Sequence, residues 1–183
     1  MATVHETQNA TAPKQAITPR GVNHIVLNVR DLEVSHRFYT EILGFKLVAA
    51  VRGDRDPESD TSKPHLHTFF AMGSGEVIAF FDIEGVEKPA RDHLPTWVRH
   101  LAMSVDSYED LMTWRQRLLD HAVRVSPVVD HGGVWFSIYF PDPNDVLLEL
   151  TYQARPLTAD DATDAARMVG EWTKAHGQKM AVH

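Results

Sequence analysis

The sequence predicts a mixed α+β fold in which a unit of one strand, one helix and three further strands is used twice and a helix is appended at the C-terminus. Two similar stretches carry this prediction. One apolar strand pattern starts at His24 and runs to Asp31, and another starts at His100 and runs to Asp106. The two histidines are 76 residues apart, and a helical pattern follows each stretch. Because similar units at a distance indicate an internal repeat, we expect the histidines to occupy equivalent places in two modules.

Composition narrows the class of protein. The chain has 183 residues, of which 43% are hydrophobic and 23% charged, as in a soluble globular domain with a substantial core. The net charge of −7 argues against a general nucleic-acid binder. With no cysteine, disulfides and thiolate metal ligands are excluded, which fits a reducing compartment. Neither a signal peptide nor a membrane-length apolar run is present, so we expect a cytoplasmic protein.

The first module is expected over about residues 21–84. Alternating apolar side chains predict a strand over 21–29, and Asp31 is a suitable N-cap for a helix over 32–43. Gly44 ends this helix, because glycine adopts the left-handed conformation easily. The elements expected next are a strand over 45–51, a charged loop with two prolines over 52–64, and strands over 65–72 and 76–83 joined by the turn 73–75.

The second module, over about residues 97–152, repeats this order. Ser107 is the expected cap of its helix, and prolines and Asn144 suit its last turn. The elements expected are a strand over 98–105, a helix over 108–121, a strand over 123–125, a loop, strands over 134–140 and 146–152, and the turn 141–145 between the last two.

The two ends of the chain lie outside the modules. Residues 1–20 have no periodicity and are expected to form a mobile arm. Pro156 closes the second module, and the extension 153–183 is expected to hold a helix over 158–176. The apolar residues of that helix recur at helical spacing, which predicts packing on the domain or on a second subunit.

Two runs of residues carry a resemblance to a known family. The first is HIVLNVRDLEVSHRFYTEILGF over 24–45, and the second is YFPDPNDVLLEL over 139–150. Both resemble the vicinal oxygen chelate superfamily, which includes glyoxalase I, extradiol dioxygenases and bleomycin- and fosfomycin-resistance proteins. The resemblance covers about residues 21–152. It departs from the family at Asp145, which replaces the usual turn glycine but tolerates the left-handed conformation. The resemblance implies two βαβββ modules whose eight strands form a cupped mixed sheet around a metal site.

The resemblance implies three metal ligands: His24, His100 and Glu149. Two imidazoles and one carboxylate form the facial triad of non-haem Fe(II) oxygenases, which leaves coordination positions open. Fe(II) is therefore the expected metal, and Mn(II), Zn(II) or Ni(II) could occupy the same ligands. Glu149 lies in an apolar strand, where an unpaired carboxylate would carry a large desolvation cost that a metal removes.

A fourth ligand distinguishes the branches of the superfamily. Members of the glyoxalase I type supply a second carboxylate from the last strand of the first module, and the matching position here is Ala79. Glu76 and Asp82 are three residues away on either side and are expected on the opposite face. Three protein ligands would leave room for a bidentate substrate and dioxygen, as in extradiol dioxygenases.

Further site residues are implied by resemblance to those dioxygenases. Tyr139 lies ten residues before Glu149, and His131 lies eight residues before Tyr139. Both are expected to contact the substrate or dioxygen. The family's acid–base histidine has no counterpart at its usual position. His67, or else His65, is expected to take its role, because a general base needs only hydrogen-bond reach and a suitable pKa.

The predicted function is Fe(II)-dependent extradiol cleavage of a catechol-like diol by a homodimer or higher homo-oligomer. Three alternatives remain. A glyoxalase- or epimerase-type lyase or isomerase needs another carboxylate, which Ala79 does not supply. A fosfomycin-type thiol transferase also uses two histidines and a glutamate but predicts a cationic pocket, which the sequence does not support. Metal-free antibiotic sequestration does not require the three ligands. Whether the modules pair within a chain or between chains is open at this stage.

Overall fold

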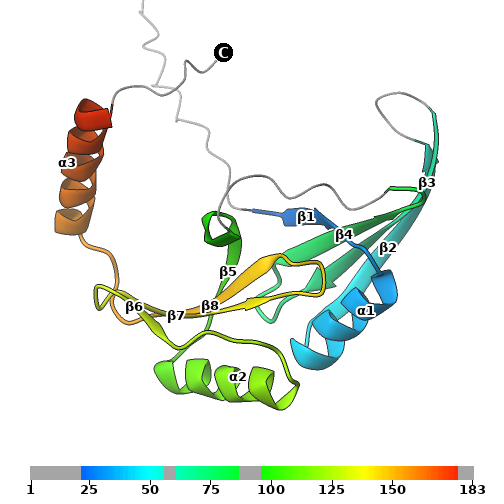
Figure 1. Cartoon of the computed structure of the whole chain (residues 1–183), viewed down its shortest axis with the longest axis horizontal. Coiled ribbons are helices and arrows are strands. Elements are labelled where there is room, and N and C mark those ends of the chain that lie inside the picture. Colours follow the sequence, from blue (N-terminus) through cyan, green and yellow to red (C-terminus); the bar gives the residue numbers. More distant parts are fainter. Residues whose placement is uncertain (1–21, 56–60, 87–95, 177–183) are drawn as a thin grey trace, which may run out of the picture.

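The computed structural model describes residues 22–55, 61–86 and 96–176 (Figure 1). The elements of the first module are β1 (His24–Asn28), α1 (Leu32–Arg37), the π-helical turn η1 (Phe38–Ile42), β2 (Lys46–Arg55), β3 (Ser62–Ala71) and β4 (Val77–Ile83). Those of the second are the 3-10 turn η2 (Thr96–Val98), β5 (His100–Ser104), α2 (Tyr108–Asp120), β6 (Val129–His131), β7 (Trp135–Pro141) and β8 (Leu147–Gln153). The helix α3 (Ala159–His176) follows. None of the described helices is both long and apolar enough to cross a membrane.

The eight described strands form two four-stranded sheets with the same topology. Their orders are β1-β4-β3-β2 and β5-β8-β7-β6. In each sheet the first strand is parallel to its neighbour, and the remaining pairs are antiparallel. Helices α1 and α2 cover the same side of the two sheets (Figure 1). The predicted α+β class and internal repeat are therefore confirmed, and His24 and His100 each begin an edge strand.

One hydrophobic core joins the two modules beneath the sheets. The helices contribute buried side chains such as Tyr39 and Leu111, and the strands contribute Phe70, Phe80 and Phe140, all fully buried in one cluster. These strand residues alternate with those on the opposite face, as a half-buried sheet requires. The core thus fixes which strand face is left open on the side away from α1 and α2.

A buried polar network locks the two modules together at the turn 141–145. The carboxylate of Asp142, only 4% exposed, accepts hydrogen bonds from the backbone N–H groups of Asn144 and Val146. It also accepts from the hydroxyl of Tyr39, at 3.0 Å, and from the side-chain amide of Asn144, at 2.9 Å. The predicted turn is confirmed, and Asp145 adopts the left-handed conformation with φ 63°. The family motif of this turn therefore serves as an intermodule clamp.

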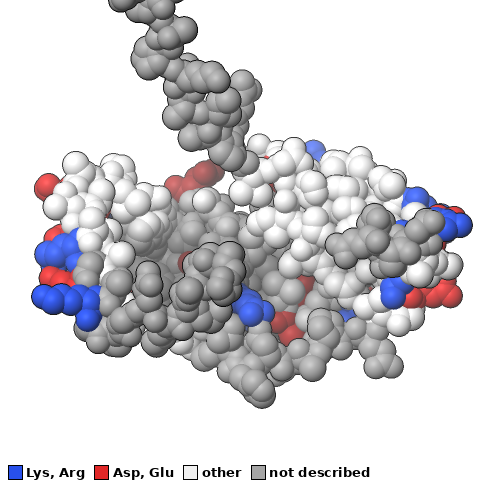
Figure 2. Space-filling model, turned by 90° about the horizontal axis from the view of Figure 1, so that it is seen from above, with Lys and Arg blue, Asp and Glu red and all other residues white. Residues whose placement is uncertain are grey.

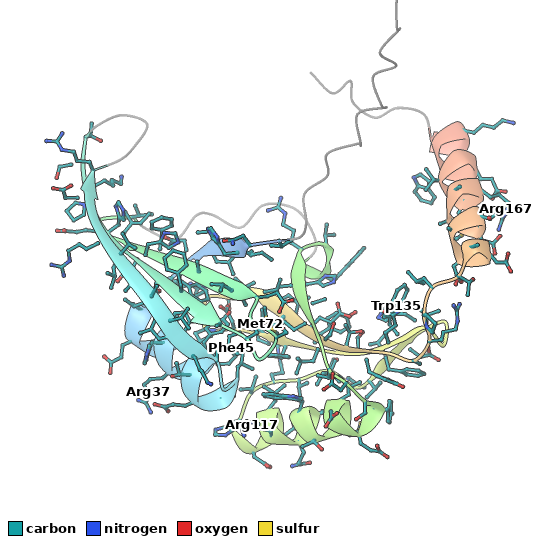
Figure 3. The ribbon with its side chains drawn as sticks, turned by 180° about the vertical axis from the view of Figure 1, so that it is seen from behind. Arg37, Phe45, Met72, Arg117, Trp135 and Arg167 are labelled. Atoms are coloured by element: carbon teal, nitrogen blue, oxygen red, sulfur yellow. The ribbon has the colours of Figure 1, made fainter. Side chains whose placement is uncertain are left out.

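The first predicted helix is confirmed with one difference. Asp31 accepts a hydrogen bond from the N–H of Val34 as its N-cap, and Gly44 has φ 74°. The last turn, however, is π-helical over Phe38–Ile42. Arg117 of α2 donates to the carbonyl groups of Glu41 and Ile42 at the end of this turn (Figure 3). A contact from the second module thus occupies carbonyls that a helix end leaves without partners.

Two predicted segments are wrong in their extent. The strand expected over 123–125 is absent, because the N–H of Val123 bonds to the Leu118 carbonyl and closes α2 instead. The strand that pairs with β7 lies later, at β6, and includes His131, which was expected in a loop. Part of the loop expected over 52–64 is strand, since β2 continues to Arg55 and β3 starts at Ser62. Exposed strand ends need few apolar residues, so composition did not reveal them.

The remaining predicted boundaries of helices and strands agree closely with those in the structure. The strand expected over 98–105 begins two residues later, after the turn η2, and Ser107 caps α2 by accepting from the N–H of Asp110. The C-terminal helix is observed as α3. The arm expected over 1–20 and the end of the extension over 177–183 lie outside the described residues.

Candidate metal centre

The strand pairing in the second sheet places the candidate residues His100, Tyr139 and Glu149 on its open face. Glu149 in β8 pairs with Ala102 of β5 on one side and with Tyr139 of β7 on the other. Their neighbours Leu148 and Leu150 point to the opposite face and are buried in the core. Glu149 itself is only 6% exposed. The apolar strand around it therefore holds one buried carboxylate on the open face.

His100 and Glu149 lie within ion-pair distance of each other on this face. The Nδ1 atom of His100 lies 3.0 Å from the carbonyl oxygen of Trp97, which can only accept, so Nδ1 carries the proton and donates it. The other ring nitrogen, Nε2, is 2.9 Å from a carboxylate oxygen of Glu149. In a neutral ring, Nε2 would then present a lone pair to the lone pairs of the carboxylate. The same two atoms could instead act as neighbouring ligands of one metal ion.

The carbonyl of Trp97 holds the His100 ring in the way that metal-binding histidines are commonly held. Such ligands usually donate their other ring N–H to a carbonyl or carboxylate, which fixes the tautomer and the ring orientation. The hydrogen bond comes from the turn η2, directly before β5. The pair of His100 and Glu149 therefore fits a divalent metal in donor type and orientation.

Tyr139 and His131 form a second hydrogen-bonded pair beside these groups. The Tyr139 hydroxyl lies 3.0 Å from Nε2 of His131. Burial raises the pKa of Tyr139, and the nearby Glu149 carboxylate raises it further. Tyr139 therefore stays protonated at neutral pH and can donate a hydrogen bond to a ligand oxygen. The structure thus brings Tyr139, His131 and Glu149 together around one cleft.

An open cleft of about 320 Å³ lies over this face. It is lined by Ala102, His131, Trp135, Tyr139, Glu149 and Thr151. None of these lining residues is Lys or Arg. Trp135, labelled in Figure 3, lies on β7 and supplies an aromatic wall. The cleft thus combines one buried carboxylate and the hydrogen-bonding side chains of His131, Tyr139 and Thr151 with apolar walls, the usual make-up of a small-molecule site.

The first sheet carries the other predicted residues. His24 lies at the start of β1, with its ring centroid 6.3 Å from that of His67. His67 stacks on Phe81 at 3.8 Å and lies 4.3 Å from Phe69. Its Nε2 atom is buried and has no hydrogen-bond partner in the described structure. Burial lowers the pKa of His67, and the neighbouring His24 and His65 lower it further, so this ring is neutral near pH 7.

Three predicted ligands are thus divided between two sheets. The described residues contain no group of three or more His, Asp or Glu side chains that could hold a metal ion. His100 and Glu149 are brought together on the second sheet, whereas His24 lies with His67 on the first. Within one chain the structure assembles two of the three ligands.

The strand pairing of the first sheet also shows which residue occupies the fourth-ligand position. Ala79 pairs with Val26 of β1 and Phe69 of β3, and it is fully buried. Asp82 follows Ala79 by three residues in β4 and pairs with Leu66 of β3. Because side chains alternate along a strand, Asp82 points to the opposite face from Ala79, as predicted. Glu76 precedes β4 and accepts a hydrogen bond from Ser74 on the surface. No carboxylate of these described residues reaches the ligand position of the first sheet.

Sequence reasoning missed two contributors to the site. Thr151 lines the cleft and accepts a hydrogen bond from the Ser137 hydroxyl at 2.9 Å. Strand alternation from Glu149 could have identified it, because residues two apart share a face. The Trp97 carbonyl could not have been identified, since a backbone acceptor in a 3-10 turn leaves no signal in the sequence.

Comparisons with known proteins agree with this architecture. The family model described as Glyoxalase/Bleomycin resistance protein/Dioxygenase superfamily matches residues 21–150, and the chain therefore belongs to this superfamily. The uncharacterized protein YaeR of Escherichia coli K12 is 32% identical over 134 residues, covering 72% of this chain and 95% of YaeR. The metallothiol transferase FosB of Bacillus licheniformis is 29% identical over 138 residues, covering 71% of this chain and 73% of FosB.

Among solved structures, a glyoxylase/bleomycin resistance protein/dioxygenase domain from Frankia sp. EAN1pec is similar, with a TM-score of 0.61 and 27% identity. The match covers 74% of this chain and 99% of that chain. The vicinal oxygen chelate fold is therefore confirmed. Of the two relatives described above, neither is named as a dioxygenase and one is named as a metallothiol transferase.

Proposed function

We propose that the protein is a metal-dependent enzyme that holds a divalent cation with His24, His100 and Glu149 and acts on a small molecule offering two oxygen atoms. The position of His100 Nε2 2.9 Å from the buried Glu149 carboxylate, with Nδ1 held by the Trp97 carbonyl, carries this proposal. A bound cation would polarise the substrate oxygens as a Lewis acid. With three protein ligands and Ala79 at the fourth position, two sites would be open for the substrate.

The third ligand, His24, would come from a second copy of the chain. Both His24 and His100 begin edge strands, since β1 and β5 each pair with a single neighbour in their sheets. A two-fold dimer that brings β1 of one copy beside β5 of the other would place each His24 near the partner's ligand pair. Such an interface is isologous and would form two equal sites.

Mixing two inactive variants tests this arrangement. In His24→Ala and Glu149→Ala proteins alone, every site lacks a ligand. After the two are unfolded and refolded together, we expect tightly bound Mn(II) to recover to about a quarter of the wild-type level, since half of the dimers are mixed and each mixed dimer holds one intact site. If all three ligands came from one chain, the mixture would bind no more Mn(II) than the separate variants.

The remaining polar residues have roles that follow from their protonation states. Tyr139 would donate its hydroxyl proton to a substrate oxygen, and His131 would orient that hydroxyl through the 3.0 Å contact. His67, neutral and with its buried Nε2 without a partner among the described residues, would accept a proton from the substrate. His65 has its Nδ1 occupied by the Lys63 carbonyl and is the weaker candidate for that step.

Group transfer or lyase chemistry is the first candidate reaction, because FosB is a metallothiol transferase and glyoxalases belong to the same superfamily. Extradiol cleavage of a catechol-like diol with Fe(II) is the second. It is favoured by the absence of Lys and Arg from the cleft lining, by the hydrogen-bonded Tyr139 and His131, and by Ala79 in place of a fourth ligand. A phosphonate substrate is disfavoured by the same lack of cationic lining.

A single assay panel separates these reactions. The protein is loaded anaerobically with Fe(II), Mn(II), Zn(II) or Ni(II), with Glu149→Ala as the matched control. Thiol consumption with an epoxide, or isomerisation of a thiohemiacetal, without oxygen uptake identifies the first candidate. Oxygen uptake with a catechol and a yellow ring-opened product identifies the second. Equal metal retention by the wild-type and Glu149→Ala proteins would overturn the proposed site itself.

A further inference from the structure

The C-terminal helix α3 has two chemically distinct faces. One face carries Asp164, Arg167 and Glu171, which form ion pairs at 3.3 and 3.0 Å. The other exposes Met168 by 54% and Val169 by 65%. Figure 1 shows α3 standing apart from both sheets, and Figure 3 shows Arg167 on the side turned away from them. An amphipathic helix gains most of its stability by packing its apolar face, so this exposed face is a candidate interface.

The start of α3 is held in a defined direction. Arg155 binds the Asp161 carboxylate with two hydrogen bonds of 2.7 and 2.8 Å. Thr158 and Asp161 also exchange side-chain-to-backbone bonds as in a capping box. The hydrogen bond from Arg155 holds the pKa of Asp161 well below its usual range. Because the Gln153 amide at the end of β8 donates to the Arg155 carbonyl, this anchor connects the helix to the second sheet.

A second apolar surface surrounds the edge strand β1 and the turn η2. Val22, just before β1, is 68% exposed, and Trp97 in η2 is 69% exposed; Val26 of β1 and Val98 of η2 are exposed as well. Figure 2 shows the charged side chains of α3 gathered on its outer edge, next to a surface without charge. Each chain therefore presents two apolar surfaces, one on α3 and one at β1 and η2.

We propose that α3 docks on the β1 and η2 surface of a second copy of this chain. Side chains of these types at these exposures offer on the order of 600 Å² of apolar surface per chain. A stable interface buries about 800 Å² per partner, of which somewhat more than half is apolar. The two surfaces together thus match what a stable dimer needs. In a two-fold dimer each copy supplies both, so both helices are covered at once.

The order of the strands is compatible with this docking. The helix α3 follows β8, which is the neighbour of β5 in the second sheet. If β1 of one copy lies beside β5 of the other, the helix that follows β8 lies close to the same partner strand. The docking is nevertheless independent of metal chemistry, and its test needs no metal.

Equal added negative charge on each face of α3 tests the proposal, with the molar mass in solution as the readout. We expect the wild-type chain to be a dimer, and the double variant Met168→Glu/Val169→Glu to dissociate at least 100-fold more readily while keeping its sheet content. The control Lys174→Glu changes the net charge by the same amount on an exposed position of the polar face and is expected to remain dimeric. A monomeric wild-type chain, or a double variant as dimeric as the control, would overturn the proposal.

Cross-linking then identifies the surface that α3 meets. The chain has no cysteine, so single-cysteine variants report one position each. A mixture of Val169→Cys and Val98→Cys chains is expected to form a disulfide-linked heterodimer in preference to either homodimer. A control mixture of Lys174→Cys and Val98→Cys is expected to form little. Homodimers of Val169→Cys alone would show that two copies of α3 pack on each other, which contradicts the docking proposed.

Discussion

Asp142→Ala is expected to lower the free energy of unfolding by about 4 kcal/mol, because it leaves four buried donors without their acceptor. These donors belong to Tyr39, Asn144 and Val146. For a chain of this size such a loss corresponds to a fall in Tm of roughly 8–16 °C, measurable by thermal or urea unfolding. Asp160→Ala, which removes an exposed carboxylate, is the control and is expected to change stability by less than about 0.5 kcal/mol. A loss of under about 1 kcal/mol for Asp142→Ala would show that the turn does not clamp the modules.

Tyr39→Phe isolates the contribution of one hydrogen bond in this network, and that contribution depends on pH. It removes one hydrogen bond to a carboxylate and is expected to cost about 2 kcal/mol. Burial, and then Asp142, raise the pKa of Tyr39 well above its usual value. The folded state thus favours the protonated phenol, so this contribution is complete below about pH 10 and is lost as the pH rises above it. The stability difference between wild type and Tyr39→Phe is therefore expected to shrink above pH 10.

Glu149→Gln is expected to lower the affinity for Mn(II) by at least about 100-fold and to abolish activity, because it removes the only charged ligand of the proposed site. The amide that replaces the carboxylate can donate a hydrogen bond to Nε2 of a neutral His100, so the metal-free variant is expected to unfold at the same temperature as the metal-free wild type or higher. Metal content after dialysis and the two unfolding temperatures measure both effects.

Thr151→Val is the matched control for Glu149→Gln, since it changes a residue of the same strand and face that lines the same cleft. It is expected to retain the metal. Unchanged metal content in Glu149→Gln would show that the ligand set is wrong. A large fall in its unfolding temperature would instead assign Glu149 a structural role.

Local patterns predicted much of this fold. Asp31 and Ser107 cap helices as expected, and Gly44 and Asp145 adopt the left-handed conformation that the turn and helix-end patterns indicated. Alternation in β8 placed Glu149 on the open face. Each of these features depends on residues a few positions apart, whose preferences are readable in a single sequence. The position of β6 depended instead on how the segment after α2 closed that helix, and the sequence prediction of a strand over 123–125 was wrong.

The sequence by itself determined the repeated modules, the two histidines at their first strands and the lack of a carboxylate at Ala79. Only the tertiary structure decided which of these groups meet. It brings His100 to Glu149 at 2.9 Å, and it leaves His24 beside His67 on the other sheet. Side-chain contacts of this kind depend on how strands far apart in the chain pair and on how the two sheets pack. Those arrangements are set by the common core and the Asp142 clamp, and no local pattern encodes them.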